Sequence, residues 1–207
     1  MKFIFGAMPE DPEFGPESEG WVAVREPGPG KIQLIAIVTA VFVGLLLQLL
    51  FWLAGANVSP LQNIRNAPIG LGIMLGIVPI HELLHLLCFP CFGLNKKSII
   101  GFWPRMFGPY VYYDGVLSRN RYMLICACPV IVLSAIPVLV SFIKPDISVI
   151  IVAVSYLNCL VCGVDLVSIF LVVKQVPSDA VVRLNGFRGY WRKQHSSNKD
   201  GNPQKGE

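Results

Sequence analysis

Residues 77–90 read IVPIHELLHLLCFP, and within them HELLH (residues 81–85) is a polar cluster inside an apolar run. The rest of the chain also contains blocks of consecutive apolar residues, and about 20 such residues span a lipid bilayer as a helix. Of the 207 residues, 54% are hydrophobic and 14% are charged, whereas soluble domains carry about 25% charged residues. The sequence therefore predicts a membrane protein with its densest polar cluster inside the membrane.

Four apolar blocks predict an all-α membrane protein with four transmembrane helices. They cover about residues 32–54, 69–92, 122–143 and 147–173. Between the second and third blocks, SIIGFW and YVYY favour β-strands and flank the turn-rich PRMFGP, which predicts a cytoplasmic β-hairpin or re-entrant loop at the membrane surface.

Composition divides the chain into three expected parts. Residues 1–30 are acidic and rich in proline and glycine, which is typical of a flexible arm. Residues 31–175 form the predicted transmembrane domain. Residues 176–207 are basic at first and then polar, and we expect this tail to be cytoplasmic and disordered at its end.

Lysine and arginine residues indicate the orientation. With four spans, all of them except Arg65 and Lys144 fall on the side of the two termini and of the loop between the second and third spans. Because basic loops remain in the cytoplasm, we expect a multi-pass protein of the cell membrane with both termini cytoplasmic. The net charge of +4 follows this distribution, so it indicates contact with the lipid bilayer and not with nucleic acid.

The spacing within HELLH is that of a zinc-binding motif. On a helix, His81 and His85 lie one turn apart on the same face and can bind one Zn²⁺. Glu82 lies beside them and can take a proton from water that the metal activates. A catalytic zinc needs a third protein ligand. His195 lies in the polar tail, whereas Asp165 in the fourth span lies at a depth similar to that of the two histidines, so Asp165 is the expected third ligand.

Other polar and aromatic residues leave alternatives open. Asn158 lies two turns before Asp165 on the same face, and it could orient a ligand or substrate or form a hydrogen bond between helices. Two C-x2-C pairs, at residues 88–91 and 159–162, occur in metal and redox sites and are also typical of small packing residues. The aromatic loop around residues 98–113 is typical of an interfacial belt, and could also be an edge strand that pairs with substrate.

HELLH in the second span, the β-prone loop and NCLVCGVD (residues 158–165) in the fourth span resemble the zincin-type membrane metallopeptidases, a family of short relatives of the site-2 proteases. The resemblance covers about residues 21–174. It implies that the protein hydrolyses peptide bonds of membrane-embedded or membrane-adjacent substrates near the cytoplasmic face. It also implies that His81, His85 and Asp165 hold zinc and that Glu82 is the catalytic base.

Two other functions are compatible with the same residues. The first is a non-catalytic membrane scaffold or regulator that keeps the metal site. The second is a small transporter that uses Asp165 and the histidines as a relay for protons or metal ions. The glutamate beside the first histidine favours the peptidase, because transport does not require it.

Overall fold

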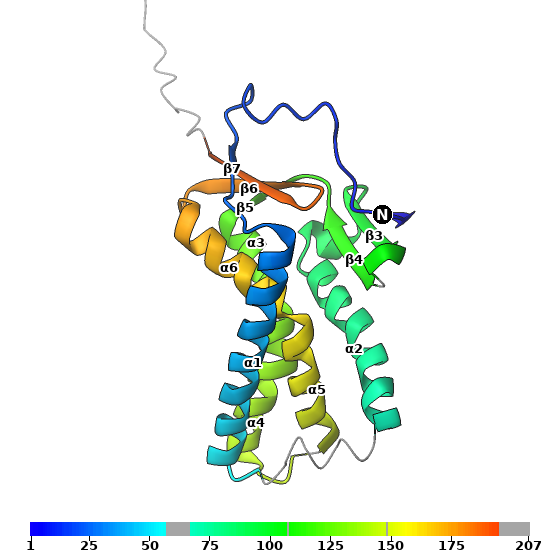
Figure 1. The fold of residues 1–207 in the computed structure, drawn as a ribbon, viewed down its shortest axis with the longest axis vertical. Coiled ribbons are helices and arrows are strands. Elements are labelled where there is room, and N and C mark those ends of the chain that lie inside the picture. The colour runs from blue at the N-terminus through cyan, green and yellow to red at the C-terminus, as the bar shows by residue number, and fades with distance from the viewer. Residues whose placement is uncertain (57–66, 107, 148, 195–207) are drawn as a thin grey trace, which may run out of the picture.

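The structure is a computed structural model that describes residues 1–56, 67–106, 108–147 and 149–194. Helices form one end of the molecule, and two β-sheets cover the other end (Figure 1). The helices are α1 (Pro29–Leu53), α2 (Ala67–Leu87), α3 (Arg119–Val130), α4 (Ile136–Ile143), α5 (Val149–Val161) and α6 (Gly163–Gln175), with the short 3₁₀ turns Pro90–Gly93 and Pro104–Met106. The strands are β1 (Lys2–Phe5), β2 (Val22–Ala23), β3 (Ser98–Trp103), β4 (Gly108–Tyr113), β5 (Val116–Ser118), β6 (Ala180–Asn185) and β7 (Arg188–Lys193).

Two helices among the described residues are long and apolar enough to cross a membrane. One is Gly30–Leu53, and the other is Arg119–Ile143, in which the π-helical turn Ile131–Ala135 joins α3 to α4. Helices α5 and α6 make a third span if the bent pair counts as one, and the apolar part of α2, Leu71–Leu87, is shorter. The outer face of α1 exposes large apolar side chains such as Leu34, Val38 and Phe42. These features support membrane association, and the expected total of four spans stays a prediction.

The fourth predicted span is not one straight helix, because α5 and α6 meet at an angle of 56°. Gly163 stands at this bend. A Cβ atom on Gly163 would lie 2.6 Å from the carbonyl oxygen of Ala36 in α1. Only glycine therefore lets the backbones of α1 and α6 approach this closely. The bend places Asp165 in the first turn of α6.

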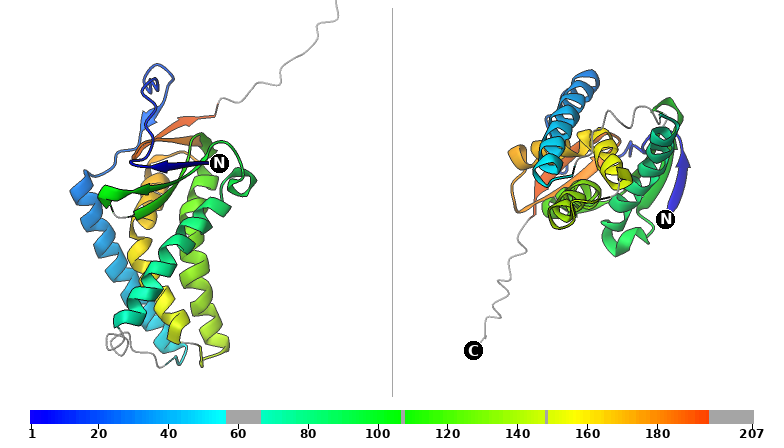
Figure 2. Two further views of the ribbon diagram at one scale, coloured as in Figure 1. Left: turned by 90° about the vertical axis from the view of Figure 1, so that its right-hand side faces the viewer. Right: turned by 90° about the horizontal axis from the view of Figure 1, so that it is seen from below.

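The prediction of an all-α fold is wrong, because two β-sheets lie at one end of the helices (Figure 2). The predicted β-hairpin is confirmed: β3 and β4 pair antiparallel from Ser98↔Tyr113 to Trp103↔Gly108, and β1 pairs parallel with β3. The second sheet has the strand order β2-β7-β6-β5. The sequence led us to expect a basic tail where the β6–β7 hairpin lies. The hairpin was not predicted because half of its side chains are basic or polar, and because its partner strand β2 lies far away in the chain.

The first 30 residues carry strands of both sheets, whereas the sequence led us to expect a flexible arm. Asp11 forms an ion pair with Arg183 at 2.8 Å, and Phe14 and Trp21 are buried. The Phe14 ring contacts both Trp21 and Tyr190 edge-on. These contacts fix the segment to β6 and β7. The division of the chain into domains stays a prediction.

The hairpin β3–β4 is held above the end of α2. Ile100 and Val111 pack against the buried side chains of Leu86 and Phe89. On the other side of the hairpin, the Tyr112 hydroxyl donates a hydrogen bond to the carbonyl oxygen of Leu184 at 2.7 Å. Burial raises the pKa of Tyr112 to about 12, so this hydroxyl keeps its proton at neutral pH. The second sheet therefore supports the hairpin from the side opposite to α2.

Candidate metal centre

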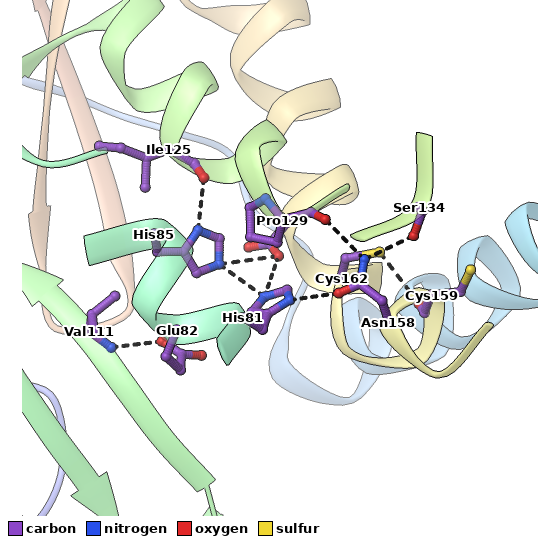
Figure 3. A network of polar contacts seen from close by, with 11 residues as sticks. His81, Glu82, His85, Val111, Ile125, Pro129, Ser134, Asn158, Cys159 and Cys162 are labelled. Atoms are coloured by element: carbon purple, nitrogen blue, oxygen red, sulfur yellow. Dashed lines mark hydrogen bonds and ion pairs between the residues drawn. The ribbon is translucent and has the colours of Figure 1, made fainter. Parts of the chain in front are cut away.

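His81 and His85 project from the same face of α2, as their spacing predicts. Both side chains are buried, with 2% and 7% of their surface exposed. Their Nε2 atoms lie 3.0 Å apart, and the two rings meet edge-on (Figure 3). Two ring nitrogens are thus directed at one small volume inside the helix bundle.

Asp165 completes a group of three. Its Oδ2 atom lies 3.1 Å from Nε2 of His81 and 3.4 Å from Nε2 of His85. The three atoms all lie within 4.8 Å of one another, and they are the group of potential metal ligands found among the described residues. Asp165 lies in the first turn of α6, the second helix of the bent pair. The bend therefore directs its carboxylate toward α2.

Hydrogen bonds at the far side of each ring fix the tautomers of the two histidines. Nδ1 of His81 lies 3.0 Å from Oδ1 of Asn158, and Nδ1 of His85 lies 2.8 Å from the carbonyl oxygen of Ile125. Both partners are acceptors, so each Nδ1 carries the proton and donates it. A neutral imidazole with a proton on Nδ1 presents a lone pair at Nε2. Both lone pairs therefore face Asp165.

These three atoms fit a zinc ion. The Oδ2 atom of Asp165 is buried and accepts no hydrogen bond from the described residues, although it faces two nitrogen lone pairs. With neutral imidazoles, such an arrangement is repulsive unless a cation lies between the atoms. Zinc binds histidine nitrogen and carboxylate oxygen at about 2.0–2.2 Å, so two ligand atoms of a tetrahedral site are separated by about 3.4 Å. The observed separations of 3.0, 3.1 and 3.4 Å are close to this value.

Asn158 is completely buried in α5, and its side chain links three helical segments. Its Nδ2 atom donates to the carbonyl oxygen of Pro129 at 3.2 Å and to the hydroxyl oxygen of Ser134 at 3.0 Å. The Ser134 hydroxyl in turn donates to the carbonyl oxygen of Ser155. Because both amide hydrogens are engaged, Oδ1 is left to accept from His81. Asn158 therefore combines the two alternatives that the sequence left open: it forms hydrogen bonds between helices, and it contacts the candidate ligand His81.

Glu82 lies next to the first histidine but turns toward the hairpin (Figure 3). Its Oε2 atom accepts a hydrogen bond from the backbone N–H of Val111 in β4 at 2.9 Å. The side chain is partly buried. The carboxylate is therefore located between the candidate metal ligands and the outer edge of the hairpin.

The cysteines do not join this group. The Sγ atom of Cys159 donates to the carbonyl oxygen of Ser155, and that of Cys162 donates to the carbonyl oxygen of Cys159. All six thiols are free. Cys159 bonds within α5, and Cys162, which stands between α5 and α6, bonds back to the last turn of α5. This agrees with their interpretation as small packing residues.

The structure brings together the candidate site residues His81, Glu82, His85, Asn158 and Asp165, while their catalytic and binding roles stay predictions. Sequence reasoning missed the supports behind them: the Ile125 carbonyl, Pro129 and Ser134. These residues lie in an apolar span and carry no motif. The one signal was a proline in the middle of that span.

A model of one protein family matches residues 74–181, which include HELLH, the hairpin β3–β4 and Asp165. The description of this family is "Putative zincin peptidase", and zincins use zinc. No curated protein and no solved structure matches the chain. The family match covers more than half of the residues and contains the whole candidate metal centre. The chain therefore belongs to the zincin peptidase family.

Proposed function

We propose that this protein is an intramembrane zinc metallopeptidase of the site-2-protease type. The observation that carries the proposal is the convergence of His81 Nε2, His85 Nε2 and Asp165 Oδ2, with Glu82 adjacent to the first ligand. Family membership supports a metallopeptidase. The two apolar helices that can cross a membrane support a site within the bilayer.

Each of these residues has a separate role in the proposed hydrolysis of a peptide bond. His81, His85 and Asp165 would hold the zinc ion, which when bound would supply Lewis-acid chemistry and make water nucleophilic near neutral pH. Glu82 takes one proton from the attacking water as its oxygen bonds to the peptide carbon. When the C–N bond breaks, Glu82 returns that proton to the leaving nitrogen, so that one water gives a carboxyl group and an amine. Asn158 holds His81 in the tautomer that presents Nε2.

The edge of β4 is the proposed substrate-binding element. Strand β4 is the last strand of its sheet, and its Val111 N–H points outward to Glu82 instead of to β3. An extended peptide can add to such an edge through backbone hydrogen bonds. Since a transmembrane helix hides its backbone, we infer that the substrate is an unwound segment of a membrane-embedded or membrane-adjacent peptide.

The site faces the cytoplasm in this proposal. The two sheets lie at the same end of the helices (Figure 1), and that end carries basic residues in the loop after α2, at the start of α3 and in β6 and β7. Lys144 follows α4 at the opposite end, and Arg65 lies outside the described residues. The positive-inside rule then supports a multi-pass protein of the cell membrane with cytoplasmic termini.

A pair of glutamate variants tests the function. Purified protein in liposomes is incubated with a library of transmembrane peptides, and products are identified by mass spectrometry. Glu82→Gln should retain zinc and lose cleavage. Glu26→Gln is the matched control, because Glu26 also accepts a hydrogen bond from a strand N–H, that of Gly189, and lies outside the centre. Full cleavage by the Glu82→Gln variant would refute the mechanism. Zinc-loaded wild type that cleaves no peptide would favour a non-catalytic scaffold.

A further inference from the structure

We propose that Pro129 is the positioning residue for both histidine ligands. It acts on His85 through the N–H that proline lacks, and on His81 through its own carbonyl oxygen. This inference rests on the proposed metal site and concerns how the chain holds that site. Pro129 lies near the end of α3 and is completely buried.

The first effect concerns the carbonyl group four residues earlier. In an α-helix, the N–H of residue 129 would donate to the carbonyl oxygen of Ile125. Proline has no N–H, so that hydrogen bond cannot form. Instead, Nδ1 of His85 donates to the Ile125 oxygen at 2.8 Å (Figure 3). A proline at position 129 thus leaves an acceptor inside the bundle, and a metal ligand uses it.

The second effect concerns Asn158. The Pro129 carbonyl oxygen accepts from Nδ2 of Asn158 at 3.2 Å, and Oδ1 of the same amide accepts from Nδ1 of His81. The π-helical turn follows at Ile131, where the N–H of Ile136 bonds five residues back to Ile131. Such π-bulges are frequent at functional sites. This turn carries Ser134, the second acceptor for the Asn158 amide.

The position of Pro129 argues against a purely structural role. Proline is the least favourable residue in a helix interior, and an alanine would stabilise the same helix. The helix Arg119–Ile143 contains a second buried proline, Pro137, at the start of α4. The carbonyl group four residues before it belongs to Leu133, and neither histidine bonds to that group. Pro137 is therefore a matched control of the same residue type in the same helix.

The test compares Pro129→Ala with Pro137→Ala in the full-length protein. Zinc affinity is measured by competition with a chelator, the ligand field from the absorption spectrum of the Co²⁺ form, and stability from the melting temperature without metal. Pro129→Ala should weaken zinc binding by about 10- to 100-fold, as is typical when a residue that orients a metal ligand is lost. It should also shift the Co²⁺ bands while the melting temperature stays equal or rises. Pro129→Ser restores the same N–H and should give the same loss, and Pro137→Ala should bind zinc as the wild type does.

Two results would overturn the proposal. One is wild-type zinc affinity and an unchanged Co²⁺ spectrum in both Pro129 variants. The other is an equal loss in Pro129→Ala and Pro137→Ala, which would indicate a general effect of helix straightening. If the wild type itself binds no zinc, the proposed function fails together with this inference. A wild type that binds zinc but is matched by Pro129→Ala refutes the role of Pro129 alone.

Discussion

The Nε2 atom of His81 and the Oδ2 atom of Asp165 lie 3.1 Å apart, although they belong to helices at opposite ends of the matched family region. The pair meets because α6 turns away from α5 by 56° and directs its first turn at α2. Nδ1 of His81 bonds to Asn158 on the other side of the ring, which leaves Nε2 directed at Asp165. This contact brings the third candidate ligand to the two histidines.

Removal of the Asp165 carboxylate should empty the centre. We expect Asp165→Ala to retain less than about a tenth of the wild-type zinc, because a catalytic zinc site needs three protein ligands. Zinc per chain, measured by plasma mass spectrometry after gel filtration, checks this. Asp146→Ala is the control, since Asp146 is an exposed aspartate in the turn after α4. Equal zinc in both variants would exclude Asp165 as a ligand.

Ser134 should affect metal binding through Asn158. In Ser134→Ala, one Asn158 hydrogen loses its acceptor, and we expect zinc affinity to fall by about tenfold. Ser141→Ala removes another completely buried hydroxyl from the same helix, one that donates only to the Val138 carbonyl group. Both variants should lose about 1–3 kcal/mol of stability. If chelator titration shows the same affinity in both, the amide network does not orient His81.

Val111 should affect cleavage and not metal binding. Val111→Pro removes the N–H that Glu82 accepts, without removing a bond to β3, since this N–H points away from the hairpin. We expect the zinc content to equal that of the wild type. We expect cleavage to fall by roughly tenfold, which corresponds to the free energy of one backbone hydrogen bond. Val111→Ala keeps the N–H and should cleave normally. Reduced cleavage in the alanine variant alone would show that the side chain, not the edge of β4, matters.

Gly163 should be intolerant of any side chain. A Cβ atom there would meet the Ala36 carbonyl oxygen at 2.6 Å, so Gly163→Ala should cost about 1–3 kcal/mol. It should also weaken zinc binding by moving Asp165. Gly44→Ala in α1 is the control, because no atom lies within 4 Å of its added Cβ and alanine favours a helix. Thermal melts with and without zinc check both effects. A neutral Gly163→Ala would show that α1 does not fix the bend.

The sequence predicts some parts of this structure well, for physical reasons. The spacing of His81 and His85 is a property of any helix, so their shared face could be predicted. The β3–β4 hairpin is local and has strong β-prone and turn residues, and its prediction is confirmed. The β6–β7 hairpin pairs with β2, near the other end of the chain, and local composition does not reveal such pairing.

The supports of the site were the least predictable part. Asn158 was recognisable as a buried amide, but its partner could have been any neighbouring helix. The Ile125 carbonyl group can accept a hydrogen bond from His85 because Pro129 has no N–H. The contact also requires that α2 packs against α3, which the local sequence does not reveal.

The proposed metal centre is best tested by X-ray absorption at the zinc edge of the wild-type protein, loaded with one zinc per chain. We expect two imidazole nitrogens and a carboxylate oxygen in the first coordination sphere, with no sulfur. Sulfur ligands would show that the metal binds to cysteines instead of to the three proposed ligands. Failure to bind one zinc per chain would contradict the metal centre altogether.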